Sequence, residues 1–320
     1  MALAPLRLPP NQLRRNYPGG DAIRRLRGGH GVGPEDWIGS TTTVFGDADL
    51  GLSRLEDGRL LRDLIAADPE AFLGREHVSR FGPEPGLLVK LLDAGGRLPV
   101  HCHPDRAFAR RHLGSRWGKT EAWIVLAAEP EARVWVGCRQ RINREVMGEW
   151  VDRQDSRAML NALNEMAVRA GDVVSVPAGV PHAIGAGILI CELQEPTDFG
   201  FLYEWRGYSP DAGAASMGLG WQRALEALDL SDSQPEAFLG LTPEMAGFFG
   251  VDWVGAEAKT AGPSFAILLV TAGSGRLSTE AGAVELRRGE AWLLPHSAGE
   301  SRFSGEGLTV LRCLPPQVED

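Results

Sequence analysis

Short apolar runs separated by turn-forming residues dominate the middle and the end of the chain. LLVKLLDA (residues 87–94), EAWIVLAAE (121–129) and GILICELQ (187–194) are too short for long helices and are bounded by Gly or polar residues, as strands are. A second group of such runs fills residues 264–314. This hydrophobic pattern predicts a mainly antiparallel β protein with two groups of strands.

Helical spacing occurs in shorter stretches between the strands. Leucine and isoleucine recur at helical intervals in residues 60–65, before Asp68-Pro69 breaks the pattern. A helix is also expected after Pro104-Asp105. A longer polar stretch predicts a helical insertion at about 139–164, and QRALEALDL (222–230) predicts one more helix.

The amino-acid composition changes after Trp205, where Ser, Gly and Ala become frequent. We therefore predict one domain over residues 1–208, with an N-terminal extension and the helical insertion. The second domain would cover residues 209–320 and begin with a linker helix. Residues 1–20, which are rich in proline and asparagine, are expected to wrap the surface.

Composition narrows the function classes. The 40 glycines and 21 prolines suit the many turns of an all-β architecture, and a net charge of -9 argues against a nucleic-acid partner. The opening residues lack the apolar core of a signal peptide, and no run reaches membrane-spanning length, so a cytoplasmic protein without a membrane partner is expected. The four cysteines form no C-x-x-C pair and are expected to be free, apolar residues. No oligomeric state is predicted.

Candidate metal ligands lie around the first group of strands. His101 and His103 are two residues apart, so on a strand both imidazoles point to the same face. Glu121 adds a carboxylate, and His182 follows a Pro-x-Gly turn. Imidazole and carboxylate together suit a borderline divalent metal.

The spacing around these residues resembles the paired motifs of the cupin superfamily. Gly95 is followed by five residues and His-x-His, and Gly171 by five residues, Pro-x-Gly, two residues and a histidine. The resemblance implies a small jelly-roll barrel whose metal is held by His101, His103, Glu121 and His182. Gly289 with Pro295 repeats part of the second motif without a His-x-His, so a second, degenerate jelly-roll unit is expected at the C-terminus.

Longer segments resemble the class I mannose-6-phosphate isomerases, particularly the short bacterial type. They are LLVKLLDAGGRLPVHCHPD, GKTEAW and AGDVVSVPAGVPHAIGAGILICELQ. The resemblance implies a zinc-dependent aldose–ketose isomerase that acts on a small sugar or sugar phosphate through a cis-enediol. Glu192 would serve as acid/base, and Lys119 would contact substrate; these two are the predicted catalytic residues.

Three positions differ from the family pattern. Pro99 replaces a serine, His101 replaces a glutamine ligand, and Phe201 or Leu202 stands where the family has an arginine. Losing the serine and the arginine predicts weak use of a phosphorylated sugar. Three histidines and a carboxylate would also accept Mn, Fe, Ni or Co. A metal-dependent cupin oxygenase and a non-catalytic carbohydrate-binding protein therefore remain alternative functions.

Overall fold

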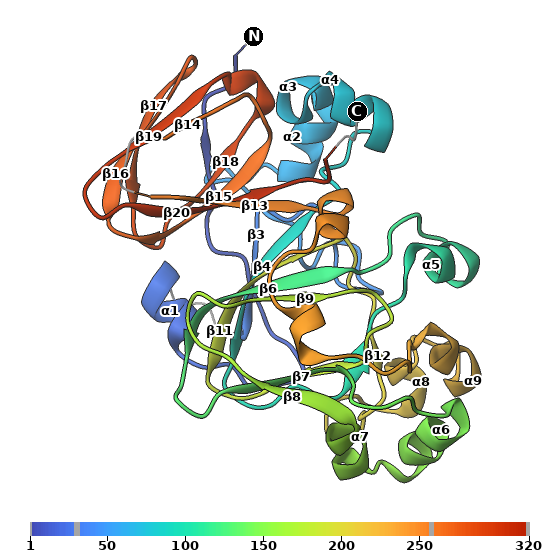
Figure 1. Ribbon diagram of the computed structural model, residues 1–320. Coiled ribbons are helices and arrows are strands. Elements are labelled where there is room, and N and C mark those ends of the chain that lie inside the picture. Colours follow the sequence, from blue (N-terminus) through green and yellow to red (C-terminus); the bar gives the residue numbers. More distant parts are fainter. Residues whose placement is uncertain (1, 29–32, 256–258, 318–320) are drawn as a thin grey trace.

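The computed structural model describes residues 2–28, 33–255 and 259–317, in which antiparallel strands form two stacked β-sandwiches (Figure 1). We call them the first and the second sandwich. In the first, one sheet has the order β2 (Gln12–Leu13), β3 (Glu35–Ile38), β4 (Leu88–Ala94), β11 (Ile188–Gln194), β6 (Glu121–Ala128) and β9 (Val173–Val176). The sheet facing it has the order β12 (Phe201–Leu202), β5 (His101–Cys102), β10 (His182–Ile184), β7 (Arg133–Cys138) and β8 (Leu163–Ala167).

The second sandwich is built mostly from the C-terminal part of the chain. Its inner sheet has the order β1 (Leu6–Arg7), β18 (Ala291–Leu294), β15 (Ala266–Ala272), β20 (Thr309–Leu314) and β13 (Gly250–Val254). Its outer sheet has the order β14 (Lys259–Ala261), β19 (Ser301–Ser304), β16 (Ser274–Thr279) and β17 (Gly282–Arg287). The predicted all-β cupin fold with a second jelly-roll unit is confirmed.

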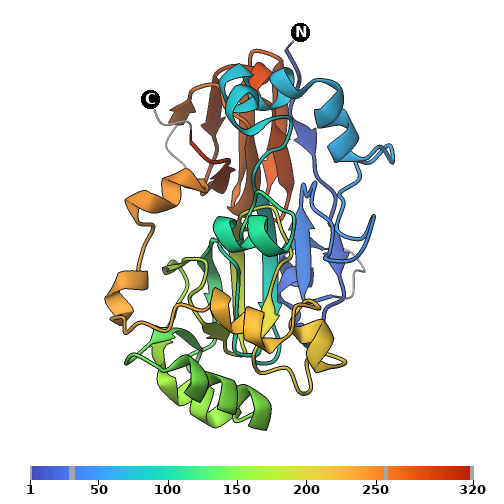
Figure 2. The same ribbon diagram turned by 90° about the vertical axis from the view of Figure 1, so that its right-hand side faces the viewer.

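The two sandwiches pack back to back, with the second above the first in both views (Figures 1 and 2). One apolar core joins Leu91 of β4 and Cys191 of β11 to Leu269, Leu293 and other residues of the inner sheet above. Strands β4 and β11 are therefore buried along their whole length, on both faces. Because both faces are covered, these strands are apolar almost throughout instead of alternating with polar residues.

Helices lie at the edges of the two sandwiches. They are α1 (Ala22–Arg27), α2 (Leu61–Ala67), α3 (Pro69–Leu73), α4 (Arg75–Phe81), α5 (Arg106–His112), α6 (Arg144–Arg153), α7 (Ser156–Ala162), α8 (Ala212–Ala215) and α9 (Trp221–Ala224). Single-turn 3₁₀ helices are η1 (Leu225–Ala227), η2 (Pro235–Phe238), η3 (Pro243–Gly247) and η4 (His296–Ala298). No helix within the three described ranges has the length and apolar character to cross a bilayer.

The predicted helical insertion is confirmed as α6 and α7, at the end of the first sandwich far from the second (Figure 2). The Asn143 side chain accepts a hydrogen bond from the Glu145 backbone and begins α6, and Asp155 begins α7 in the same way through Ala158. Between them, Gln154 adopts a left-handed conformation (φ 55°) that ends the first helix.

Residues 2–20 lie mostly at the surface, as expected, but they also take part in both sandwiches. Leu8 and Leu13 are buried, β1 pairs with β18, and β2 pairs with β3. The segment therefore contributes one edge strand to each sandwich. Our division of the chain after residue 208 stays a prediction. The four cysteines are buried free thiols.

Candidate metal centre

Three histidines meet inside the first sandwich. His101 on β5 lies directly opposite His182 on β10, and His103 follows one residue after the end of β5. Their ligand atoms all lie within 4.8 Å of one another, and the three side chains are buried. Glu121, the first residue of β6, approaches from the facing sheet.

Backbone carbonyls fix the tautomer of each histidine. The Nδ1 atoms of His101, His103 and His182 lie 2.8, 2.7 and 2.8 Å from the carbonyl oxygens of Pro99, Phe199 and Val180, in that order. A carbonyl oxygen can only accept, so each Nδ1 carries the hydrogen and each Nε2 presents a lone pair. Metal-binding histidines are commonly oriented by such outer hydrogen bonds.

The lone pairs of His101 and His182 face each other without a proton between them. Burial lowers the pKa of His103 and His182 to about 3 and that of His101 well below its usual value, so all three rings are neutral near pH 7. The Nε2 atoms of His101 and His182 nevertheless lie 2.9 Å apart. Two facing lone pairs repel unless a cation lies between them, so this donor set fits a divalent metal.

Glu121 completes the donor set. Its Oε1 accepts a hydrogen bond from Trp123 Nε1 (2.9 Å), and its buried Oε2 is paired with the ammonium of Lys119. Oε2 lies 3.1 Å from His103 Nε2. Burial alone would raise the pKa of Glu121, but the charge of Lys119 and contact with His103 hold it well below its usual range. The carboxylate is therefore ionised and faces the histidines.

The two predicted catalytic residues lie beside this cluster. The ammonium of Lys119 lies 2.8 Å from His103 Nε2 and 2.9 Å from Glu121 Oε2. Glu192 Oε1 is 3.6 Å from the same ammonium and 3.0 Å from that of Lys90. Burial, together with the nearby charge of Glu121, raises the pKa of Glu192 to about 7. Such a carboxyl group can both take up and release a proton near neutral pH.

Lys90, Arg15, Glu35 and Asp198 also line the site, although sequence reasoning did not identify them. Arg15 forms ion pairs with Glu35 (3.3 Å) and Asp198 (2.9 Å), while Lys90 lies on β4 directly opposite Glu192 on β11. The single lysine within the apolar run LLVKLLDA was the one local signal for Lys90. Arg15 comes from the N-terminal segment, where no pattern pointed to a site.

The cavity beside the histidines has a volume of about 150 Å³. Leu202 and Pro99 line it, whereas Phe201 points away into the core beside Phe108. Leu202 therefore occupies the position facing the site. The lysines and the arginine that line this cavity all lie within 4 Å of a carboxylate, so none of these described cations is left without an anionic partner.

The chain is similar in sequence to known mannose-6-phosphate isomerases. No family model matches the chain. The chain is 28% identical to mannose-6-phosphate isomerase ManA of Bacillus subtilis, over 73% of this chain and 78% of that protein. It is 29% identical to mannose-6-phosphate isomerase of Streptococcus mutans, over 72% of this chain and 76% of that protein.

Solved structures show the same fold. A crystal structure of the mannose 6-phosphate isomerase from Bacillus subtilis superposes with a TM-score of 0.77 at 22% identity, covering 97% of this chain and 99% of that one. The fold is therefore that of a solved isomerase along nearly the whole chain. The predicted resemblance to mannose-6-phosphate isomerases is confirmed.

Proposed function

We propose that the protein is a metal-dependent aldose–ketose isomerase of a small sugar, with one divalent ion held by His101, His103, Glu121 and His182. The observation that carries the proposal is the convergence of three Nε2 lone pairs and an ionised carboxylate next to Glu192. Zinc suits three imidazoles and one carboxylate, although Mn, Fe, Ni or Co would also fit this donor set. When bound, the ion would polarise or orient the substrate oxygens.

The residues around the ion supply proton transfer. Glu192 takes the proton from C2 of the open-chain aldose and returns it to C1, while the hydroxyl proton of O2 passes to O1, so that a cis-enediol connects the aldose and the ketose. Burial raises the pKa of Glu192 into a range from which one carboxyl group can act first as base and then as acid, and a bound ion would lower this pKa toward the basic form that takes up the C2 proton. Lys119, with its ammonium near Glu121 and Glu192, donates hydrogen bonds to the substrate oxygens where negative charge develops. Burial of both groups keeps water from the reacting carbons.

Isomerisation is tested by incubating the metal-loaded protein with a panel of aldoses, free and phosphorylated, in D₂O. Deuterium appearing at the exchanged carbon together with formation of the ketose supports the proposal. Oxygen consumption by the iron-loaded protein, without ketose formation, would instead indicate an oxygenase. Saturable sugar binding without turnover, in protein shown to contain metal, would indicate a binding protein.

We expect the protein to use free aldoses better than mannose 6-phosphate. Leu202 and Pro99 offer no donor to a phosphate, and the cations of this cavity are engaged by carboxylates. Each missing charge-assisted bond costs about 1.5–3 kcal/mol, or roughly one to two decades of affinity. Steady-state kinetics on both substrates measures the difference.

The matched variant for this comparison is Leu202→Arg, which places a guanidinium at the cavity wall. It should raise kcat/KM for mannose 6-phosphate relative to the free aldose by roughly tenfold or more. Turnover of mannose 6-phosphate by the unchanged protein at about 10–10³ per second would contradict the expectation. It would mean that another residue binds the phosphate.

Metal uptake should release a proton from Glu192. In the metal-free protein its pKa is raised to about 7, so the group is mostly protonated at about pH 6 and mostly ionised at about pH 8. A nearby dication lowers the pKa of a carboxyl group. Binding should therefore release up to about one proton at about pH 6 and fewer at about pH 8, while the neutral histidines release none.

Calorimetric titration of metal into the protein, in buffers of different ionisation enthalpy, measures this release. The Glu192→Gln variant should bind metal without the pH-dependent part of the release. Proton release that is the same in both proteins would mean that Glu192 is already ionised before metal binds.

A further inference from the structure

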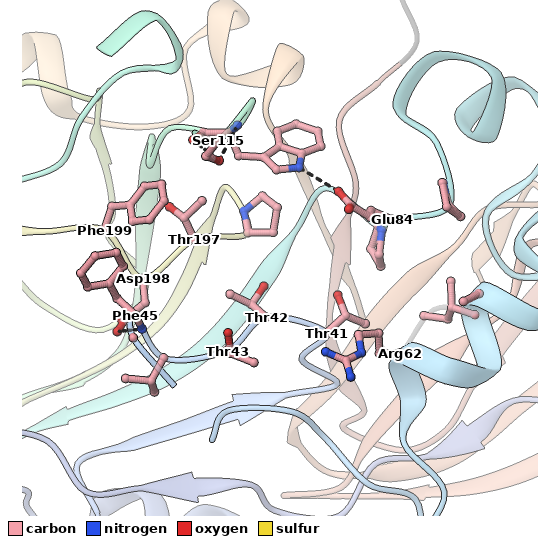
Figure 3. A pocket seen from close by; sticks show the side chains of 18 residues that line it. Thr41, Thr42, Thr43, Phe45, Arg62, Glu84, Ser115, Thr197, Asp198 and Phe199 are labelled. Carbon is pink, nitrogen blue, oxygen red and sulfur yellow. Dashed lines mark hydrogen bonds between the residues drawn. The ribbon is translucent and has the colours of Figure 1, made fainter. Parts of the chain in front are cut away.

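A second hollow lies beside the metal centre (Figure 3). Its volume is about 500 Å³, and it is lined by residues 41–46, 83–85 and 196–199, together with three residues of α2 and two of the segment after α5. Asp198 and Phe199 line both this hollow and the metal cavity. One short segment of chain therefore separates the two.

Contacts on both sides hold this segment in place. The Phe199 carbonyl accepts the hydrogen bond from His103 Nδ1, while the Phe199 ring packs edge-on against Phe45, with ring centroids 5.7 Å apart. Asp198 accepts a hydrogen bond from the Phe45 backbone (3.2 Å) and pairs with Arg15. The wall of the hollow is thus built from residues that also support a candidate metal ligand.

Hydroxyl groups and aromatic rings share the lining. Thr41 and Thr43 both line the hollow, and within the described part of the chain no hydrogen bond engages either hydroxyl. Thr197 donates to the Gly118 carbonyl (2.7 Å) and can still accept a hydrogen bond. Phe45 and Trp117 supply apolar ring surface. A polyhydroxylated molecule with apolar C–H faces matches this mixture of groups.

The charges around the hollow favour a neutral ligand. Each of its two carboxylates already faces an arginine, since Asp198 pairs with Arg15 and Glu84 with Arg116 (2.9 Å). Arg62 extends from α2 into the hollow and lies 3.6 Å from the carboxylate of its neighbour Asp63. Among the described residues that line the hollow, there is therefore no cluster of uncompensated positive charge to hold a phosphate.

We propose that this hollow binds a neutral saccharide unit, at a site separate from the metal centre. Hydroxyl groups of the sugar bond to Thr41, Thr43 and the Arg62 guanidinium, and its C–H face packs on Phe45. The volume accommodates a single sugar ring, within the range of ordinary small-molecule pockets. The site needs no metal, so saccharide binding in the hollow can be tested independently of the proposed isomerase activity.

The test is a titration of chelator-treated protein with D-mannose, D-glucose and maltose, followed by isothermal calorimetry or ligand-observed NMR. Thr43→Val should weaken binding by about threefold to tenfold through one lost hydrogen bond. Phe45→Ala should weaken it by about tenfold through loss of the ring surface. Leu50→Ala is the matched control, because Leu50 is an exposed apolar residue of the same loop that does not line the hollow, and it should leave the affinity unchanged.

Inorganic phosphate should not displace the sugar. The proposal is overturned if no sugar binds saturably at about 10 mM, or if the Thr43 and Phe45 variants bind as tightly as the unchanged protein. Competition by phosphate would also overturn it, since the hollow would then be an anion site. Thermal melting of each variant verifies that Phe45→Ala, a substitution at an exposed side chain, leaves the protein folded.

Discussion

A protein carrying both His103→Ala and His182→Ala should contain no bound metal after dialysis, whereas the unchanged protein should retain one ion per chain. The double substitution leaves only His101 and Glu121 of the four donors. Altering even an outer partner of a ligand costs roughly 10–100-fold in metal affinity, so the loss of two direct ligands should exceed that range. Elemental analysis of the purified proteins measures the content, and isomerase activity should be lost with it.

The control for this variant is His296→Ala. His296 follows Pro295 in the second sandwich, at the place where the C-terminal unit repeats part of the metal motif without its other ligands. Its removal should leave the metal content unchanged. If the double variant kept its metal with the same stoichiometry and affinity, the ion would be held elsewhere and the assignment of the four ligands would be wrong.

The Glu192→Gln variant should lose roughly 10²–10⁴-fold in kcat while keeping its metal. Glutamine has the shape of the protonated carboxyl group, which the raised pKa of Glu192 already favours, so the fold should tolerate it. The amide cannot take the proton from C2, however. Measuring kcat, KM and metal content on the same preparation separates a chemical loss from a loss of the ion.

An exposed carboxylate on the same sandwich provides the matched control. Glu165 lies on β8, with its side chain 57% exposed, and Glu165→Gln should leave kcat unchanged. Equal activity of the Glu192 variant and the unchanged protein would show that another group transfers the proton. Lys119 would then be the next candidate, because its ammonium lies 3.6 Å from Glu192.

The meeting of the three histidines was predictable, because their spacing along the chain determines their geometry. Two histidines at alternate positions of a strand must share a face, and the glycine and proline positions around His182 marked the turn that brings it back. Lys90 was not predictable in the same way. It meets Glu192 only because β4 pairs with β11 in one particular register, which no local pattern specifies.

The structure was also needed to decide which of two adjacent residues stands at the position of the family arginine. Phe201 and Leu202 were equally good matches to the family arginine, and adjacent residues of a strand point to opposite faces. Leu202 pairs with His101 in the sheet and lines the cavity, while Phe201 belongs to the core. Similarly, the apolar runs of β4 and β11 predicted buried strands but did not reveal that a second sandwich covers their outer face.

The pairing of β1 with β18 limits when the inner sheet of the second sandwich can form during synthesis. Leu6 leaves the ribosome well before its partner Leu293 has been synthesised. The inner sheet of the second sandwich therefore cannot complete the pairing of this edge strand with β18 until residue 293 has emerged. Contacts between such distant positions form slowly, because the loop that joins them costs entropy before any contact compensates. Until β15, β18 and β20 have been synthesised, the face of β4 and β11 that they cover is exposed in the nascent chain, and an exposed apolar surface is open to aggregation or to a chaperone.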